Sequence, residues 1–169
     1  IDTEFFNSKI NLKQSKTTAF GMTKRSGRSA NNDPGLASLM NANTETVCVV
    51  GKTWDFHVDL ALGISKKENL ENIKETTKYF VESKKEFIFD AEHFFDGYKN
   101  NPEFALECLL SAYNSGAWWI VLCDTNGGTL PNEVGEIISQ VTKKIPGKNI
   151  GIHAHNDTEN ARSEEHTSE

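Results

Sequence analysis

Two histidines spaced two residues apart are the sequence feature with the clearest chemistry. They lie in Gly151-Ile152-His153-Ala154-His155-Asn156-Asp157, at the end of a strand-like run. Side chains at positions i and i+2 of a β-strand point to the same face, so both imidazoles can reach one divalent ion such as zinc or manganese. A carboxylate or amide from elsewhere must complete such a site. His153 and His155 are therefore candidate metal ligands, and a hydrogen-bonded pair of structural histidines is the alternative.

A candidate base lies in Phe89-Asp90-Ala91-Glu92-His93-Phe94-Phe95. The alternation of a strand places Asp90 and Glu92 on one face. A carboxylate among aromatic side chains can act as a general base. The pattern therefore makes Glu92 a candidate catalytic residue, and a solvated loop acid is the alternative.

Polar and ionisable residues follow every strand-like run. In a barrel of parallel strands, all carboxyl ends meet on the face where barrel enzymes place their active sites. We therefore favour one shared site over the alternative that these residues are only solvent-exposed loop residues. Two further roles are left open. Lys24, Arg25 and Arg28 could bind phosphate or form a solvated loop, and His57 could face the site or be a packed histidine. The groups are, in chain order, Thr23 to Arg25; Lys52, Asp55 and His57; Asp90, Glu92 and His93; Asp124, Thr125 and Asn126; and His153, His155, Asn156 and Asp157.

Alternating strands and helices must position these residues. The predicted strands start 29, 40, 32 and 31 residues apart, which is typical of βα units in a parallel sheet, and their composition predicts burial on both faces. A doubly wound sheet and a (β/α)₈ TIM barrel both fit; no G-x-G-x-x-G follows the first strand, and five strands cannot close a barrel. The strands are Thr17 to Met22, Thr46 to Val50, Glu86 to Ala91, Trp118 to Cys123 and Asn149 to Ala154.

Helices are predicted between the strands. One begins after Ser65, which with Glu68 matches a capping box, and others begin at Pro102 and Pro131. A weaker helix is predicted from Thr3 to Lys13 and a short one after Pro34.

Composition narrows the class of protein. The 169 residues carry 24 acidic and 18 basic side chains, a net charge of −6 that argues against nucleic acid as a partner. The apolar runs are too short to cross a membrane, and no signal peptide is visible. Three cysteines without a C-x-x-C pattern fit buried free thiols and a cytoplasmic location.

The last eight residues, 162–169, resemble the translation of a short-read sequencing adapter. An ordinary polar tail is the alternative. We expect residues 1–161 to form a partial catalytic domain and residues 162–169 not to be native. Without this tail the net charge is −4, because one base and three acids leave with it, and His166 is no longer a candidate residue.

Five motifs give the chain a family resemblance that covers it up to Ala161. It resembles the pyruvate carboxyltransferase-like superfamily of 2-isopropylmalate and homocitrate synthases, and within it the citramalate synthase branch. The resemblance implies a partial TIM barrel with about strands 3 to 7, lacking strands 1, 2 and 8. The motifs are Ala19 to Arg25, Gly51 to Val58, Phe89 to Tyr98, Leu122 to Pro131 and His153 to Ala161.

The resemblance also implies a reaction. Acetyl-CoA and pyruvate would condense to (R)-citramalate and CoA, a step toward isoleucine. His153 and His155 would hold a divalent ion (Mn, Zn, Mg or Co), Glu92 would act as base or position water, and Thr125 and Asp124 would bind substrate. The family's Arg-Asp-Gly motif is absent from these residues, so we expect no turnover from this chain alone.

Some alternatives remain open within that resemblance. The 2-oxo acid of a 2-isopropylmalate or homocitrate synthase would be different, and an aldol-cleaving lyase is less favoured. A non-catalytic fragment that does not fold stably is the alternative from another class. The resemblance further implies a homodimeric parent protein.

Overall fold

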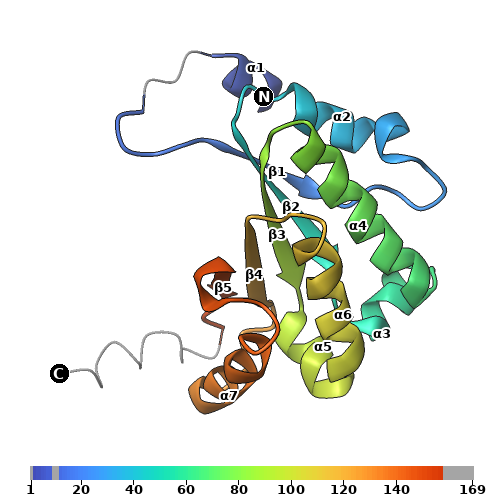
Figure 1. The fold of residues 1–169 in the computed structure, drawn as a ribbon, viewed down its shortest axis with the longest axis vertical. Helices are drawn as coiled ribbons and strands as arrows, with labels where there is room; N and C mark the ends of the chain where they lie inside the picture. Colours follow the sequence, from blue (N-terminus) through green and yellow to red (C-terminus); the bar gives the residue numbers. More distant parts are fainter. Residues whose placement is uncertain (1, 9–11, 158–169) are drawn as a thin grey trace.

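Five parallel strands form the single sheet of the computed structural model, which describes residues 2–8 and 12–157 (Figure 1). All five predicted strands are confirmed, with ends displaced by one or two residues. Strand order follows chain order, so each strand pairs with its neighbours in sequence. The strands are β1 (Thr18–Met22), β2 (Thr46–Lys52), β3 (Glu86–Glu92), β4 (Trp119–Asp124) and β5 (Ile150–Ala154).

The longer helices begin where the sequence predicts. The Ser65 side chain accepts a hydrogen bond from the Glu68 backbone at 3.1 Å, and the Asn101 side chain accepts one from Phe104 at 3.2 Å. The capping box at Ser65 is only half formed, because the Glu68 carboxylate accepts a hydrogen bond from Ser26 instead. These helices are α2 (Pro34–Asn41), α4 (Lys66–Glu82), α6 (Pro102–Tyr113) and α7 (Pro131–Val141).

Other short helical segments differ from the prediction. The N-terminal helix α1 spans Asp2–Asn7, so its predicted extension to Lys13 is wrong; Leu12 and Lys13 are not helical. Helix α3 (Asp55–His57) with its π-helical turn (Val58–Leu62) and helix α5 (Phe94–Asn100) were not predicted. Single 3₁₀ turns cover Ala30–Asn32 and Gly147–Asn149.

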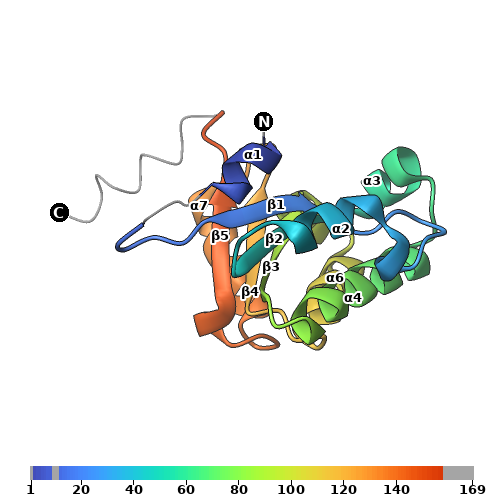
Figure 2. The same cartoon turned by 90° about the horizontal axis from the view of Figure 1, so that it is seen from above.

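The helices cover one face of the sheet, which distinguishes the two predicted architectures. Helices α2, α4 and α6 lie together beside strands β1 to β4 (Figure 2). Val49, Phe89 and Leu122 are fully buried beneath the helices in one core cluster. A doubly wound sheet carries helices on both faces and reverses its strand order at a switch point. Sequential order with one covered face is instead the arrangement of a barrel wall.

The opposite face, which we call the open face, carries the alternate side chains of each strand. Phe20 and Met22 on β1 are 61% and 53% exposed. The predicted burial of every strand on both faces is therefore wrong for β1, and β5 is largely exposed as well. Both lie at the edges of the sheet, where no further strand covers them. The open face holds Phe20, Met22, Cys48, Val50, Lys52, Ile88, Asp90, Glu92, Trp119, Val121, Cys123, Gly151 and His153.

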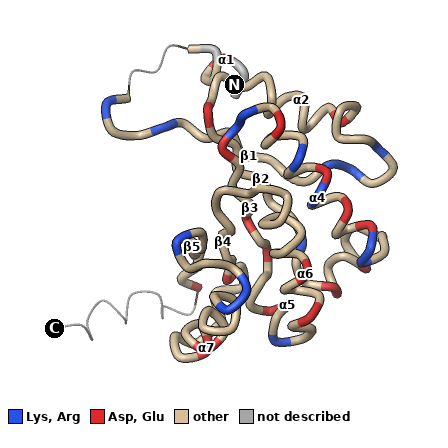
Figure 3. The backbone as a smooth tube through the Cα atoms, viewed as in Figure 1, with Lys and Arg blue, Asp and Glu red and all other residues tan. Residues whose placement is uncertain are grey.

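The distribution of charge and the length of the helices are relevant to nucleic acid and membranes as partners. Acidic and basic segments are mixed along the helices seen in Figure 3. None of the helices in residues 2–8 and 12–157 combines the length and the apolar character needed to span a membrane. The predicted adapter-like tail, residues 162–169, lies outside the described residues.

The Asp33 carboxylate caps helix α2. It accepts hydrogen bonds from the backbone N–H groups of Arg25, Gly35 and Leu36 at 2.8, 2.8 and 3.1 Å. Burial by itself raises the pKa of this carboxyl, but the three donors outweigh it and the pKa lies below its usual value. The cap therefore stabilises the fold above about pH 4, and this stabilisation is lost as the pH falls through the lowered pKa.

We expect Asp33→Asn to lower the free energy of unfolding by about 1–2 kcal/mol at pH 7, because an amide NH2 in place of Oδ2 cannot accept the hydrogen bond from the Arg25 backbone N–H. The loss shrinks toward pH 3, because the wild-type carboxylate becomes protonated there as well. Urea unfolding at both pH values measures this difference. Asp59→Asn, at an exposed position, is the matched control and should change stability by less than about 0.5 kcal/mol. A loss that is the same at both pH values contradicts the prediction.

Candidate active site

The carboxyl ends of three neighbouring strands bring Asp90, Cys123 and His153 together on the open face. His153 Nδ1 lies 3.4 Å from Asp90 Oδ2 and 3.9 Å from Cys123 Sγ. One ligand atom from each of the three residues lies within 4.8 Å of the other two. Asp90 and Cys123 are buried, whereas the His153 side chain is 52% exposed. The group therefore has two buried members and one that faces solvent.

Glu92 forms an ion pair with Lys52 on the adjacent strand. The two residues are partners in the β2–β3 register, and Lys52 Nζ lies 2.5 Å from Glu92 Oε2. Phe94 and Phe95, its aromatic neighbours in sequence, are fully buried in the core, and the role of Glu92 as a base stays a prediction. The ion pair holds the Glu92 carboxylate in one position at the carboxyl end of β3.

The two predicted metal ligands lie side by side. The rings of His153 and His155 stack with centroids 5.2 Å apart. His153 Nδ1 faces Asp90, while His155 Nδ1 lies 3.8 Å from a carboxylate oxygen of Asp157. Both side chains are about half exposed and reachable from solvent. Their joint ligation of one ion stays a prediction.

The predicted substrate residues occupy the turn after β4. Both carboxylate oxygens of Asp124 accept hydrogen bonds from Thr129, one from its backbone at 3.1 Å and one from its hydroxyl at 2.9 Å. Thr125 Oγ1 accepts a hydrogen bond from the His93 backbone at 2.9 Å. Asp124 thus shapes the turn, and Thr125 keeps a hydroxyl hydrogen to donate. Substrate contact by either residue stays a prediction.

An aromatic cluster of Trp54, His57 and His93 lies beside the ion pair. The rings of His57 and His93 meet edge to face with centroids 4.3 Å apart, and Trp54 lies 4.7 Å from His57. Burial lowers the pKa of His57, and the charges of His93 and Lys52 lower it further. A β-carbon on Gly97 would lie 2.5 Å from the Thr53 carbonyl oxygen, so glycine permits α5 to approach the loop that carries this cluster.

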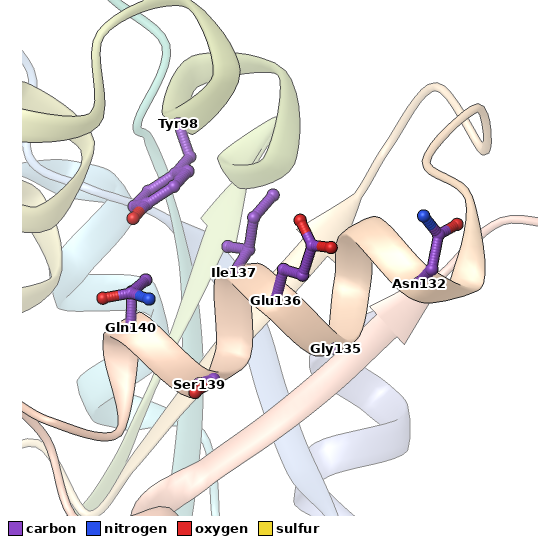
Figure 4. Close-up of a pocket in the computed structure, with 7 residues that line it drawn as sticks. All are labelled: Tyr98, Asn132, Gly135, Glu136, Ile137, Ser139 and Gln140. Carbon is purple, nitrogen blue, oxygen red and sulfur yellow. The ribbon is translucent and has the colours of Figure 1, made fainter.

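A groove of about 690 Å³ lies elsewhere, on the helical side (Figure 4). Tyr98 from α5 lies opposite Ile137 and Gln140 from α7. None of the candidate site residues lines this groove. The candidate chemistry therefore belongs to the open face and its strand ends.

A sequence profile of the HMGL-like family matches residues 16–164, which include all five strands and every candidate site residue. The chain belongs to the HMGL-like family. The family resemblance inferred from the motifs is confirmed at this level.

Related sequences refine the placement of this HMGL-like chain. It is 51% identical over 162 residues to an (R)-citramalate synthase of Aquifex aeolicus, covering 95% of the chain and 31% of the relative. For the (R)-citramalate synthase of Geobacter sulfurreducens the identity is 48% over 160 residues, covering 94% and 30%. A 2-isopropylmalate synthase of Prochlorococcus marinus is 33% identical over 108 residues, covering 62% and 19%. The chain spans about 30% of the length of these citramalate synthases.

Solved structures share the fold of the HMGL-like chain. A hydroxymethylglutaryl-CoA lyase from Pseudomonas aeruginosa superposes with a TM-score of 0.77 at 15% identity, covering 98% of the chain and 53% of the lyase. The lyase from Bacillus subtilis gives a TM-score of 0.74 at 16% identity, covering 93% and 50%. These likenesses show the fold alone. The five parallel strands thus correspond to about half of each lyase chain.

The structure of this HMGL-like chain places two residues in the candidate site that the sequence did not single out. Lys52 was one of several polar groups after a strand, and Cys123 was interpreted as a buried free thiol. The pairing of Lys52 with Glu92 could have been found from sequence. Each residue stands six positions after the first residue of its strand, so two parallel strands that start in register place them side by side. Cys123 and His153 are register partners as well, but sequence alone does not show that β4 and β5 are neighbours.

Proposed function

We propose that this HMGL-like chain is part of an (R)-citramalate synthase, which condenses acetyl-CoA with pyruvate and releases CoA. The supporting observation is the 51% identity over 95% of the chain, against 33% over 62% for a 2-isopropylmalate synthase. We also propose that β1 to β5 are strands 3 to 7 of an eight-stranded barrel. Strand order, the one-sided helices and the 53% coverage of a lyase chain support that placement.

A divalent ion is part of this proposal. His153 and His155 would hold it, together with a carboxylate from outside the described residues. The donor chemistry fits, because two half-exposed imidazoles lie at a strand end beside the buried Asp90 carboxylate. When bound, the ion acts as a Lewis acid toward the keto group of pyruvate.

The side chains of this chain account for the proton transfers and the orientation of substrate. The Glu92 carboxylate accepts a proton from the acetyl methyl group, and Lys52 holds that carboxylate in place. The carbanion then attacks the keto carbon of pyruvate, whose carboxylate accepts a hydrogen bond from the Thr125 hydroxyl. The C=O π electrons move to the keto oxygen, which takes up the proton released by the Glu92 carboxyl to give the hydroxyl group of the product. Water cleaves the thioester, releases CoA and makes the reaction irreversible.

A substrate comparison tests this function in the full-length protein. With Mn²⁺ and acetyl-CoA present, we expect kcat/KM for pyruvate to exceed that for 3-methyl-2-oxobutanoate or 2-oxoglutarate by at least about tenfold. Loss of thioester absorbance follows the reaction without interference from the three free cysteines. A preference for 3-methyl-2-oxobutanoate or 2-oxoglutarate assigns the chain to a 2-isopropylmalate or homocitrate synthase instead.

A further inference from the structure

The spacing of Asp90, Cys123 and His153 is close to that of ligands around one tetrahedral ion. A zinc ion bound to sulfur at about 2.3 Å and to nitrogen and oxygen at about 2.0–2.1 Å separates nitrogen from oxygen by about 3.3 Å and nitrogen from sulfur by about 3.6 Å. The corresponding distances here are 3.4 Å from His153 Nδ1 to Asp90 and 3.9 Å from His153 Nδ1 to Cys123 Sγ. The third separation, between Asp90 and Cys123, is no more than 4.8 Å.

The electrostatics of this group favour a cation. Asp90 is 6% exposed, and burying a carboxylate is costly unless a positive partner accompanies it. Among the described residues, the only ion pair that Asp90 forms is with His153, which is charged only when protonated. The nearby ammonium group of Lys52 is already paired with Glu92. A divalent ion would compensate the buried charge.

We propose that Asp90, Cys123 and His153 bind a thiophilic divalent cation, such as Zn²⁺, Cd²⁺ or Co²⁺, with solvent at the fourth position. This ligand set differs from the His153 and His155 pair and shares one histidine with it. Thiophilic ions select the Cys123 set, whereas Mg²⁺ and Mn²⁺ favour nitrogen and oxygen ligands. The binding does not depend on the proposed condensation reaction.

Binding to the thiol requires the loss of one proton. The Cys123 thiol lies 3.9 Å from His153 Nδ1, and sulfur binds a metal ion as the thiolate. Binding therefore exchanges the thiol proton for the metal, with the proton released to solvent, and the affinity rises with pH.

Sulfur-to-metal charge-transfer absorbance on addition of Cd²⁺ or Co²⁺ tests the proposal. We expect the band to saturate at one metal ion per chain. It should be lost in Cys123→Ser and retained in Cys48→Ser and Cys108→Ser. Cys48 is the sharper control, because it lies on the same open face but outside the three-residue group. His153→Ala should weaken Cd²⁺ binding by at least about tenfold, whereas His155→Ala should leave the band in place.

The titration is done on the 169-residue chain and on the full-length protein, with circular dichroism confirming that each variant is folded. Absence of the band from both proteins overturns the proposal, and so does a band that survives Cys123→Ser. Dependence on His155 instead of His153 also overturns it. The absorbance does not require turnover, so a full-length protein that binds Cd²⁺ but forms no citramalate contradicts the proposed function alone.

Discussion

Glu92→Gln in the full-length protein is expected to lower kcat by about 10²–10⁴-fold while changing KM for pyruvate little. The amide has nearly the same shape as the carboxylate but cannot accept a proton from the acetyl methyl group. It also gives up the 2.5 Å ion pair with Lys52. Steady-state kinetics with Mn²⁺ and saturating acetyl-CoA measure both constants, and the rate of methyl-proton exchange into deuterated water isolates the proton transfer.

Glu86→Gln is the matched control for this substitution. Glu86 lies on the same strand and the same face as Glu92 and forms an ion pair with a lysine, Lys16, at 3.1 Å. It lies at the amino end of β3, away from the predicted chemistry, so kcat should stay within about twofold of wild type. If Glu92→Gln retains kcat within threefold, Glu92 is not the base and its pair with Lys52 is structural.

Phe89→Ala is expected to lower the free energy of unfolding of the chain by about 3–5 kcal/mol. Phe89 is fully buried beneath the helices, and its ring lies over Gly51, where a β-carbon would be 2.6 Å from the ring. The truncation opens a cavity in the centre of the sheet, on strand β3. Because domains are stable by only about 5–15 kcal/mol, a loss of this size is a large fraction of the total. Urea unfolding followed by tryptophan fluorescence measures it.

Phe20→Ala removes the same ring from the other side of the sheet. Phe20 lies on the open face and is 61% exposed, so its truncation should change the stability of the 169-residue chain by less than about 1 kcal/mol. Equal losses at Phe20 and Phe89 would mean that the covered and the open face have been assigned the wrong way round.

Strands and long helices were accessible from sequence because their signals are local. Runs rich in valine, isoleucine and phenylalanine separate from amphipathic segments, and the regular spacing of βα units indicates parallel pairing. Asn101 followed by Pro102 predicts the start of α6, and in the structure the Asn101 side chain accepts a hydrogen bond from the Phe104 backbone N–H. Local signals could not decide between an open doubly wound sheet and a barrel wall, because the two differ in which faces of the sheet the helices cover.

The parts that sequence missed depend on packing between segments. Helix α5 begins at Phe94, directly after a strand and a left-handed residue at His93, so its start has no capping signal. The exposure of β1 and β5 follows from their edge positions and not from their composition, which matches that of buried strands. The approach of Cys123 to His153 likewise requires the neighbour relation of β4 and β5. The site was thus predicted as a location, and its internal contacts were not.

The sequential order of the strands has a consequence for how the chain folds. Every strand pairs with strands that immediately precede or follow it in sequence, so no pairing has to wait for a distant segment. Loop closure is short for each βα unit, which favours rapid assembly despite the parallel sheet. On the ribosome, β1 and β2 can pair before β5 has been made, and the sheet can grow one unit at a time as the chain emerges.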